Sequence, residues 1–363
     1  MTHKSKSRHK EYALILTFFT LPILYYLQNN NNLFGIIMVN LLSLATILYS
    51  AFSVVRHADV LAHRLGEPFG SLILSLSVVI LEVSLISALM ATGDTEPTLM
   101  RDTLFSVIII VIGGLVGIAL LIGGRKFETQ HVNLAGIKQY LISIIPLAFI
   151  VLVLPTTLPN NSFSPLQMGI VAILSAAMYA VFLIIQTKTH QNLFIYEHED
   201  EESDDDGHHG KPSPHSSWWH ATWLIIHLIS VIAVTKMNAI PLDHLLTALN
   251  APHAFTGFLV ALLILSPEGL GALKAVINNQ VQRAMNIFFG SVIATISLTV
   301  PSVCLIAYIT SQQLEFGLST SNIVILSTAL LLSVVSFLTG KTNQLNGIAH
   351  LVVFAAYIMI LLS

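Results

Sequence analysis

Two glutamates in apolar surroundings are the residues of this sequence best placed to do chemistry. Glu82 lies within GSLILSLSVVILEVSLISALM, and Glu268 lies within GFLVALLILSPEGLGALKAV. An ionised carboxylate inside a bilayer costs several kcal/mol, so it persists there only with a partner or a function. A carboxyl group in such a place can hold a proton or a metal cation. The alternative is a permanently protonated carboxyl that only hydrogen-bonds neighbouring helices.

The remainder of the chain has the composition of an integral membrane protein. Of its 363 residues, 54% are hydrophobic and only 10% are charged, whereas soluble domains carry about 25% charged residues. The formal net charge of −3 gives no reason to expect a nucleic-acid partner. The sequence has no HExxH or GxSxG motif, which argues against an intramembrane enzyme.

Long apolar stretches predict an all-α membrane protein, because an open sheet would leave unpaired edges in lipid. A helix needs about 20 apolar residues to cross the hydrocarbon core. We expect about eleven transmembrane helices, at 12–27, 33–55, 68–91, 103–124, 137–155, 165–186, 218–235, 254–276, 284–309, 322–338 and 346–362.

The placement of Lys and Arg predicts an orientation for these spans. If the basic N-terminus is cytoplasmic and the chain crosses eleven times, 14 of the 16 Lys and Arg residues fall on the cytoplasmic side. Only Arg101 and Lys236 fall on the other side. Because short cytoplasmic connections are enriched in Lys and Arg, we expect a cytoplasmic N-terminus and a C-terminus outside.

An acidic segment, EHEDEESDDD at 197–206, separates the sixth and seventh spans. Such a run repels itself and stays solvated, so a cytoplasmic spacer is the favoured interpretation. Loose regulatory binding of Ca²⁺ is the alternative, although the segment lacks the spacing of an EF-hand. The acidic residues concerned are Glu197, Glu199, Asp200, Glu201, Glu202, Asp204, Asp205 and Asp206.

The stretches around the two glutamates resemble each other. Each has an apolar helix with a glutamate near its middle, then a short connection, then an arginine (Arg101 or Arg283) at the start of the next span. In the predicted orientation the third span runs outward and the eighth runs inward. Antiparallel repeats of this kind are typical of secondary transporters, whose ion site lies at the repeat interface. We expect a tail and extra first helix at 1–32, five-helix repeats at 33–190 and 218–363, and a linker at 191–217.

Further oxygen donors can be assigned near both glutamates. Ser71 and Ser75 share one helical face with Glu82, because Ser75 follows Ser71 by 4 residues and Glu82 follows Ser75 by 7. Pro267 has no N–H to donate to the carbonyl of Leu263, so that oxygen is free beside Glu268 and a kink is expected. Carboxylate and carbonyl oxygens suit hard cations. Other candidate donors in adjacent spans are Ser106, Asn286, Ser291 and Thr295.

The histidines give weaker signals. His57 and His63 fall in RHADVLAHR, which we interpret as a polar cytoplasmic connection, with pH sensing as the alternative. His227 and His350 fall within spans and are more typical of hydrogen bonds between helices than of metal ligands.

The chain resembles the cation/proton exchanger branch of the cation/calcium exchanger superfamily. The resemblance rests on residues 51–93, the acidic segment, and residues 254–291. The repeat motif of that family, Gly-Asn-x-x-Glu, places its glutamates at Glu82 and Glu268. The Gly-Asn pair itself is replaced by valines at 78–79 and by Ile-Leu at 264–265. A later Gly-Ser is retained at 290–291, but alanine stands at 294 where the family has glutamine.

This resemblance implies ten repeat helices and one extra helix in a bacterial inner membrane, with the C-terminus periplasmic. It also implies exchange of Ca²⁺, Na⁺ or K⁺ for H⁺ without a cofactor, by alternating access. Because the amide ligands are absent, the choice of cation stays open. A passive cation channel with a glutamate-lined pore is the alternative function, and a homo-oligomer is compatible with either.

Overall fold

The computed structural model describes residues 11–27, 32–65, 69–90, 97–194, 215–252 and 254–362, without the side chains at 62–63 and 69–75. Within these residues, eight helices are long and apolar enough to cross a membrane, and three shorter apolar helices accompany them. The eleven predicted spans are therefore confirmed in type and position. The chain forms two compact units, one of residues 1–92 and 200–249 and the other of 93–199 and 250–363.

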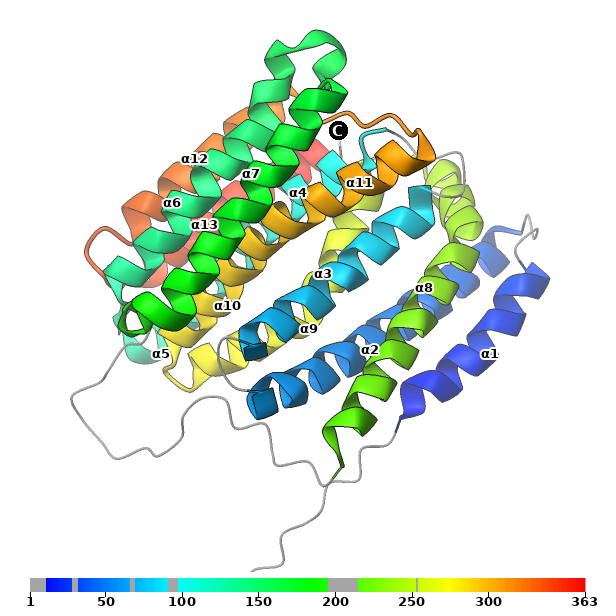
Figure 1. Cartoon of the computed structure of the whole chain (residues 1–363), viewed down its shortest axis with the longest axis horizontal. Helices are drawn as coiled ribbons and strands as arrows, with labels where there is room; N and C mark the ends of the chain where they lie inside the picture. The colour runs from blue at the N-terminus through cyan, green and yellow to red at the C-terminus, as the bar shows by residue number, and fades with distance from the viewer. Residues whose placement is uncertain are drawn as a thin grey trace, which may run out of the picture. The chain divides into compact units, whose positions relative to one another are not determined.

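The first unit contains four helices, which are α1 (Tyr12–Leu27), α2 (Leu33–Leu65), α3 (Phe69–Met90) and α8 (Ser217–Ala248). Each of α1 and α3 packs against both α2 and α8, which also pack against each other (Figure 1). A polar stripe runs along the buried face of α2 at helical spacing, through Asn40, Ser43, Thr46, Ser50, Ser53 and His57. Its hydroxyl groups donate mainly to carbonyls one turn earlier, as Ser43 does to Val39. This unit therefore has a polar interior that is largely satisfied within its own helices.

The second unit contains the remaining spans, four of which include a π-helical segment, and in two of these the segment lies in the middle of the span. One span joins α4 (Leu99–Ile109), the π segment η1 (Ile110–Leu115) and α5 (Val116–Phe127). Another joins α10 (Val281–Ala294), the π segment η7 (Thr295–Thr299) and α11 (Val300–Thr310). The other helices are α6 (Leu134–Ala148), α7 (Pro165–Ile184), α9 (Ala254–Ile277), α12 (Thr320–Ser336) and α13 (Gln344–Leu361).

Short segments complete this unit. β1 (Gln130–His131) pairs antiparallel with β2 (Lys341–Thr342), so the residues that precede α6 and α13 lie together. The short helical segments are η2 (Phe149–Val153), η3 (Leu154–Thr157), η4 (Pro159–Asn161), η5 (Ile185–Thr189) and η6 (Gln191–Phe194).

Side-chain caps explain where several helices begin. Asn133 accepts from the backbone N–H groups of Ala135 and Gly136 at the start of α6. Ser164 and Gln167 form a reciprocal capping box at α7, and Asn343 and Asn346 form another at α13. Such caps satisfy N–H groups that have no partner inside the helix.

Two glycines set close helix contacts in the second unit. A Cβ at Gly257 of α9 would lie 2.8 Å from backbone atoms of Asp102 and Thr103 in α4. A Cβ at Gly347 of α13 would overlap the backbone of α5 at Leu121. Only a residue without a side chain permits these approaches, as is common between transmembrane helices.

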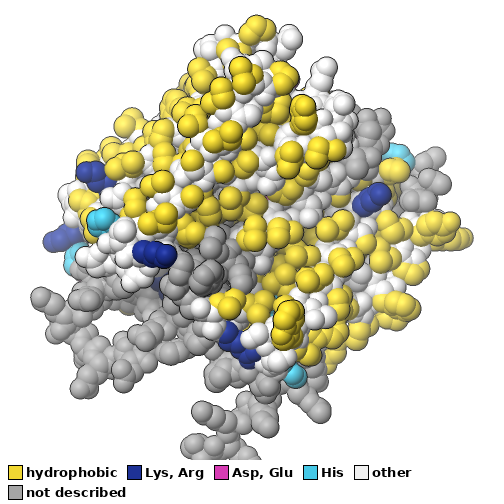
Figure 2. Space-filling model, in the orientation of Figure 1, with side chains coloured by type: hydrophobic (Ala, Val, Ile, Leu, Met, Phe, Trp, Pro, Cys, Tyr) yellow, Lys and Arg dark blue, Asp and Glu magenta, His cyan; other side chains and the backbone are white. Residues whose placement is uncertain are grey.

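Many apolar side chains lie on the face drawn in Figure 2. On α7, exposed side chains include Leu166, Ile173 and Val181, which are 76%, 71% and 54% exposed. A helix with such an outward face is suited to contact lipid, since exposed apolar surface of this extent is unfavourable in water.

The structure corrects the predicted ends of two spans. The second continues to Leu65 and the seventh to Ala248, whereas the sequence predicted ends near 55 and 235. The segment RHADVLAHR is therefore helical, and the interpretation of His57 as a loop residue is wrong, because its side chain is fully buried in α2. The sequence predicted an early end because this segment has polar side chains, although its backbone continues the same helix.

Candidate cation-binding site

Glu82 lies on α3 in the first unit and is completely buried. Its neighbours along the helix are mostly apolar, and α3 packs against α2 and α8. The backbone of Ser71 and Ser75 belongs to α3 as predicted, while the positions of their side chains lie outside the described structure. Glu82 is therefore an acidic group inside a helical unit, as the sequence predicted.

Glu268 lies on α9 in the second unit, facing Ser291 of α10. Its Oε2 atom is shielded from solvent and has no hydrogen-bond partner among the described residues, and the same holds for Ser291 Oγ. The Ser291 hydroxyl is nevertheless close enough to the Glu268 carboxyl group to influence it. Two oxygen-bearing groups that approach without bonding leave lone pairs available to a cation or a proton.

The backbone beside Glu268 adds another oxygen. Helix α9 runs continuously through Pro267 from Ala254 to Ile277. Proline has no N–H, so the carbonyl of Leu263 cannot receive the usual bond from position 267. The Leu263 carbonyl therefore remains a candidate donor.

Two other predicted donors already have partners within the second unit. Ser106 Oγ lies 2.6 Å from the Asp102 carbonyl and 2.7 Å from the hydroxyl of Tyr357 on α13. Asn286 donates to the Phe194 carbonyl at 2.7 Å and accepts from a glutamine on its own helix. The structure thus joins Ser106 to α13 and Asn286 to the segment that follows α7.

The predicted site residues divide between the two units. Ser71, Ser75 and Glu82 belong to the first, and the structure brings Glu268 and Ser291 together in the second. Thr295 is buried in η7, one turn beyond Ser291. The acidic segment at 197–206 lies outside the described residues.

Eleven apolar helices, with a buried acid in α3 and a half-buried acid in α9 whose Oε2 atom is shielded, define a multi-spanning membrane protein of the kind that moves ions. The model of the sodium/calcium exchanger protein family matches residues 35–188 and again residues 219–363. The chain belongs to this family.

Individual relatives agree with this assignment. The chain is 69% identical over 354 residues to the sodium-potassium/proton antiporter ChaA of Escherichia coli (strain K12), covering 98% of this chain and 97% of the relative. It is 32% identical over 328 residues to the putative ionic transporter y4hA of Sinorhizobium fredii (strain NBRC 101917 / NGR234), covering 89% of this chain and 88% of that one.

Solved structures share the fold at low sequence identity. Native YfkE matches with a TM-score of 0.74 and 14% identity, covering 96% of this chain and 99% of that one. The H⁺/Ca²⁺ exchanger CAX matches with a TM-score of 0.68 and 14% identity, covering 98% of this chain and 89% of that one. The fold is therefore that of known membrane exchangers.

Proposed function

We propose that this protein is a secondary antiporter that exports Ca²⁺, Na⁺ or K⁺ in exchange for H⁺. The observation that carries the proposal is a carboxyl group with a shielded, unbonded oxygen on a membrane-spanning helix, at Glu268. A second carboxyl group, Glu82, is completely buried, and the repeats predicted from the sequence match it with Glu268. The 69% identical relative is named a sodium-potassium/proton antiporter, which supports the same reaction here.

Exchange follows from competition for the same oxygens. Burial penalises the charged carboxylate, so a site without a cation favours the protonated acid. A cation that binds favours the carboxylate and displaces the proton, and a returning proton removes the ligand of the cation. If the binding site can switch its access from one side of the membrane to the other only when the acids are neutralised, inward proton flow drives cations outward.

The residues proposed for this site are those that the sequence singled out. Glu82 and Glu268 carry the charge, and two carboxylates can balance one divalent ion or serve monovalent ions singly. Neutral oxygens would come from the Leu263 carbonyl and from Ser71, Ser75, Ser106, Asn286 and Ser291. We place the acids in two inverted five-helix repeats, with the N-terminus cytoplasmic, in a bacterial inner membrane.

Everted membrane vesicles from a host without its own antiporters provide the test. A preformed pH gradient should collapse when Ca²⁺, Na⁺ or K⁺ is added, and the cation that acts identifies the substrate. Glu82→Gln and Glu268→Gln should each abolish the response, because glutamine keeps the shape but carries neither the proton nor the charge. Glu128→Gln is the matched control, since Glu128 is exposed after α5.

Two results would contradict the proposal. No response to any of the three cations from well-inserted protein would exclude this exchange. Cation flux that is indifferent to the pH gradient would instead indicate the channel alternative, because a channel does not couple the cation to protons.

A further inference from the structure

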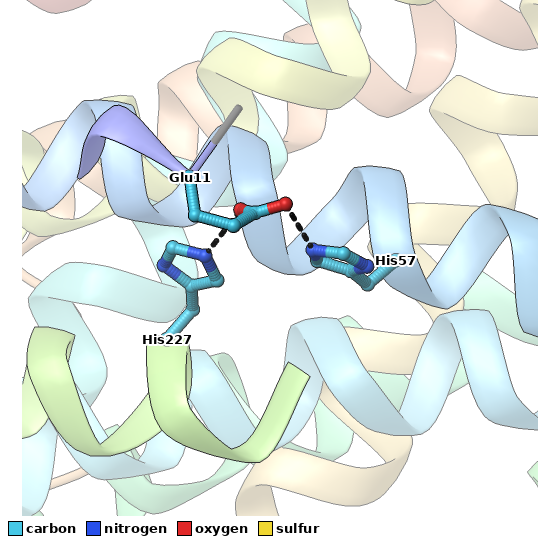
Figure 3. A group of neighbouring side chains, drawn as sticks. All are labelled: Glu11, His57 and His227. Carbon is cyan, nitrogen blue, oxygen red and sulfur yellow. Dashed lines mark hydrogen bonds and ion pairs between the residues drawn. The ribbon is translucent and has the colours of Figure 1, made fainter. Parts of the chain in front are cut away.

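A compact group of titratable side chains lies in the first unit and includes none of the residues assigned to transport. Glu11 directly precedes α1, His57 lies near the end of α2, and His227 lies in the first half of α8. The three side chains converge on one point (Figure 3). Both histidine side chains are 0% exposed, and the glutamate side chain is 10% exposed.

The distances suit a metal ion. Glu11 Oε2 lies 2.9 Å from His227 Nε2, and Glu11 Oε1 lies 3.5 Å from His57 Nε2. One ligand atom from each residue lies within 4.8 Å of the other two. Zn²⁺ binds nitrogen and oxygen at about 2.1 Å in tetrahedral sites, which places neighbouring ligand atoms about 3.4 Å apart. Small side-chain movements would therefore seat an ion without rebuilding the helices.

A contact with a residue outside the group orients the His57 ring. His57 Nδ1 lies 2.8 Å from Nδ1 of His220, so one of these two nitrogens carries the shared proton. When His57 is the donor, its Nε2 has a lone pair, and this atom lies 3.5 Å from Glu11 Oε1 and 3.4 Å from a guanidinium nitrogen of Arg56. Metal-bound histidines commonly donate their other ring N–H in this way, which fixes the ring and its tautomer. A cation between His57 and Glu11 then satisfies two groups that could not bond each other.

The ion pair with Arg56, at 2.7 Å, favours the carboxylate form of Glu11, which is the form that binds metals. Burial raises its pKa, but the hydrogen bond with His227 and the charge of Arg56 outweigh burial, and the pKa of Glu11 lies below its ordinary value. Arg56 lies 2.7 Å from Oε2, whereas buried Oε1 has no hydrogen-bond partner among the described residues. The guanidinium competes with a cation for this carboxylate, so its charge weakens metal binding.

We propose that Glu11, His57 and His227 form a binding site for a divalent transition metal of the Zn²⁺ class. Two imidazoles and one carboxylate favour such ions over Na⁺, K⁺ and Ca²⁺, which prefer sites made of oxygen alone. The site uses none of the transport residues, so its test is independent of the proposed exchange. A bound ion would fasten the residue before α1 to both α2 and α8.

Binding of Zn²⁺ and Co²⁺ to the full chain in detergent tests this site. One ion should bind per chain in the presence of excess Ca²⁺, and it should raise the apparent Tm, because a ligand of the folded state stabilises it. Glu11→Gln, His57→Asn and His227→Asn should each weaken this binding roughly tenfold or more. His190→Asn is the matched control, since His190 is an exposed histidine of the second unit. Every variant keeps the acidic segment at 197–206, so any weaker binding of metal by that segment is the same in all of them.

Two further variants keep the test decisive if a histidine variant unfolds. Arg56→Gln should tighten binding severalfold, because it removes the competing charge. His227→Cys should retain binding and add a thiolate-to-Co²⁺ charge-transfer band, which arises only if position 227 contacts the metal. Equal affinity in folded wild type, His57→Asn and His227→Asn would overturn the proposal, as would a His227→Cys protein that binds Co²⁺ without that band.

Discussion

Alanine substitution at two glycines of α9 should have opposite effects on stability. Gly257 and Gly271 are both interior residues of the helix that carries Glu268. At Gly257 a Cβ would lie 2.8 Å from backbone atoms of α4, whereas at Gly271 it would meet no heavy atom within 4 Å. The same chemical change therefore probes a tight contact in one case and open space in the other.

The magnitude follows from two opposing terms. Replacing glycine by alanine inside a helix gains about 1 kcal/mol from backbone propensity. Overpacking typically costs about 1–3 kcal/mol, and the upper part of that range applies at Gly257 because a helix backbone cannot rotate away. Gly257→Ala should thus lower the free energy of unfolding by about 1–2 kcal/mol, while Gly271→Ala should raise it by about 0.5–1 kcal/mol.

Thermal unfolding of the purified variants in one detergent measures the difference. At about 2 °C per kcal/mol, the two apparent Tm values should differ by roughly 3–6 °C, with wild type between them. A Gly257→Ala protein at least as stable as Gly271→Ala would refute the reasoning. It would mean that α9 and α4 do not approach at Gly257 as described.

Two other polar contacts give predictions, one for amide exchange and one for thermal unfolding. Arg101 donates to Asp102 at 2.8 Å and to Glu315 at 3.1 Å, so Arg101→Gln should speed amide exchange across 311–319; Arg283→Gln, at an exposed arginine, should not. Asn40 accepts from Asn238 at 3.2 Å in the interior of the first unit. Asn40→Ala should lower the free energy of unfolding by about 1–3 kcal/mol, seen as a lower apparent Tm, because a buried donor loses its acceptor; an unchanged Tm would contradict this.

The length of the apolar stretches predicted the spans well, because a single segment that crosses lipid has to be helical to satisfy its own backbone hydrogen bonds. Residues 165–186 and 254–276 are bounded by polar connections, and the structure places α7 and α9 within two residues of those limits. Glu82 and Glu268 could be singled out for the same reason, since a carboxyl within an apolar run is conspicuous. The predicted repeat boundaries and the shared cation site stay predictions.

Contacts between distant residues could not be predicted in this way. Nothing in the sequence singled out Glu11, and His57 was interpreted as a loop residue, because their common neighbour lies far along the chain at position 227. RHADVLAHR has several charged and polar residues, so a span predicted from the length of the apolar stretch ended too early. A polar residue at every third or fourth position of 40–57 was the available signal for a continuous helix with one polar face.

The π segments η1 and η7 change how the sequence of their spans should be compared with other proteins. A π turn accommodates one residue more than an α turn, and one residue corresponds to about 100° of rotation. A pattern drawn at 3.6 residues per turn therefore loses phase halfway along each span, so positions that appear to share a stripe in α10 and α11 point in different directions. Deleting one residue from Thr295–Thr299 would restore the phase while changing no side chain outside η7. Each of these segments thus adds one residue to its span. An alignment that places a single-residue gap there compares the two halves of the span correctly.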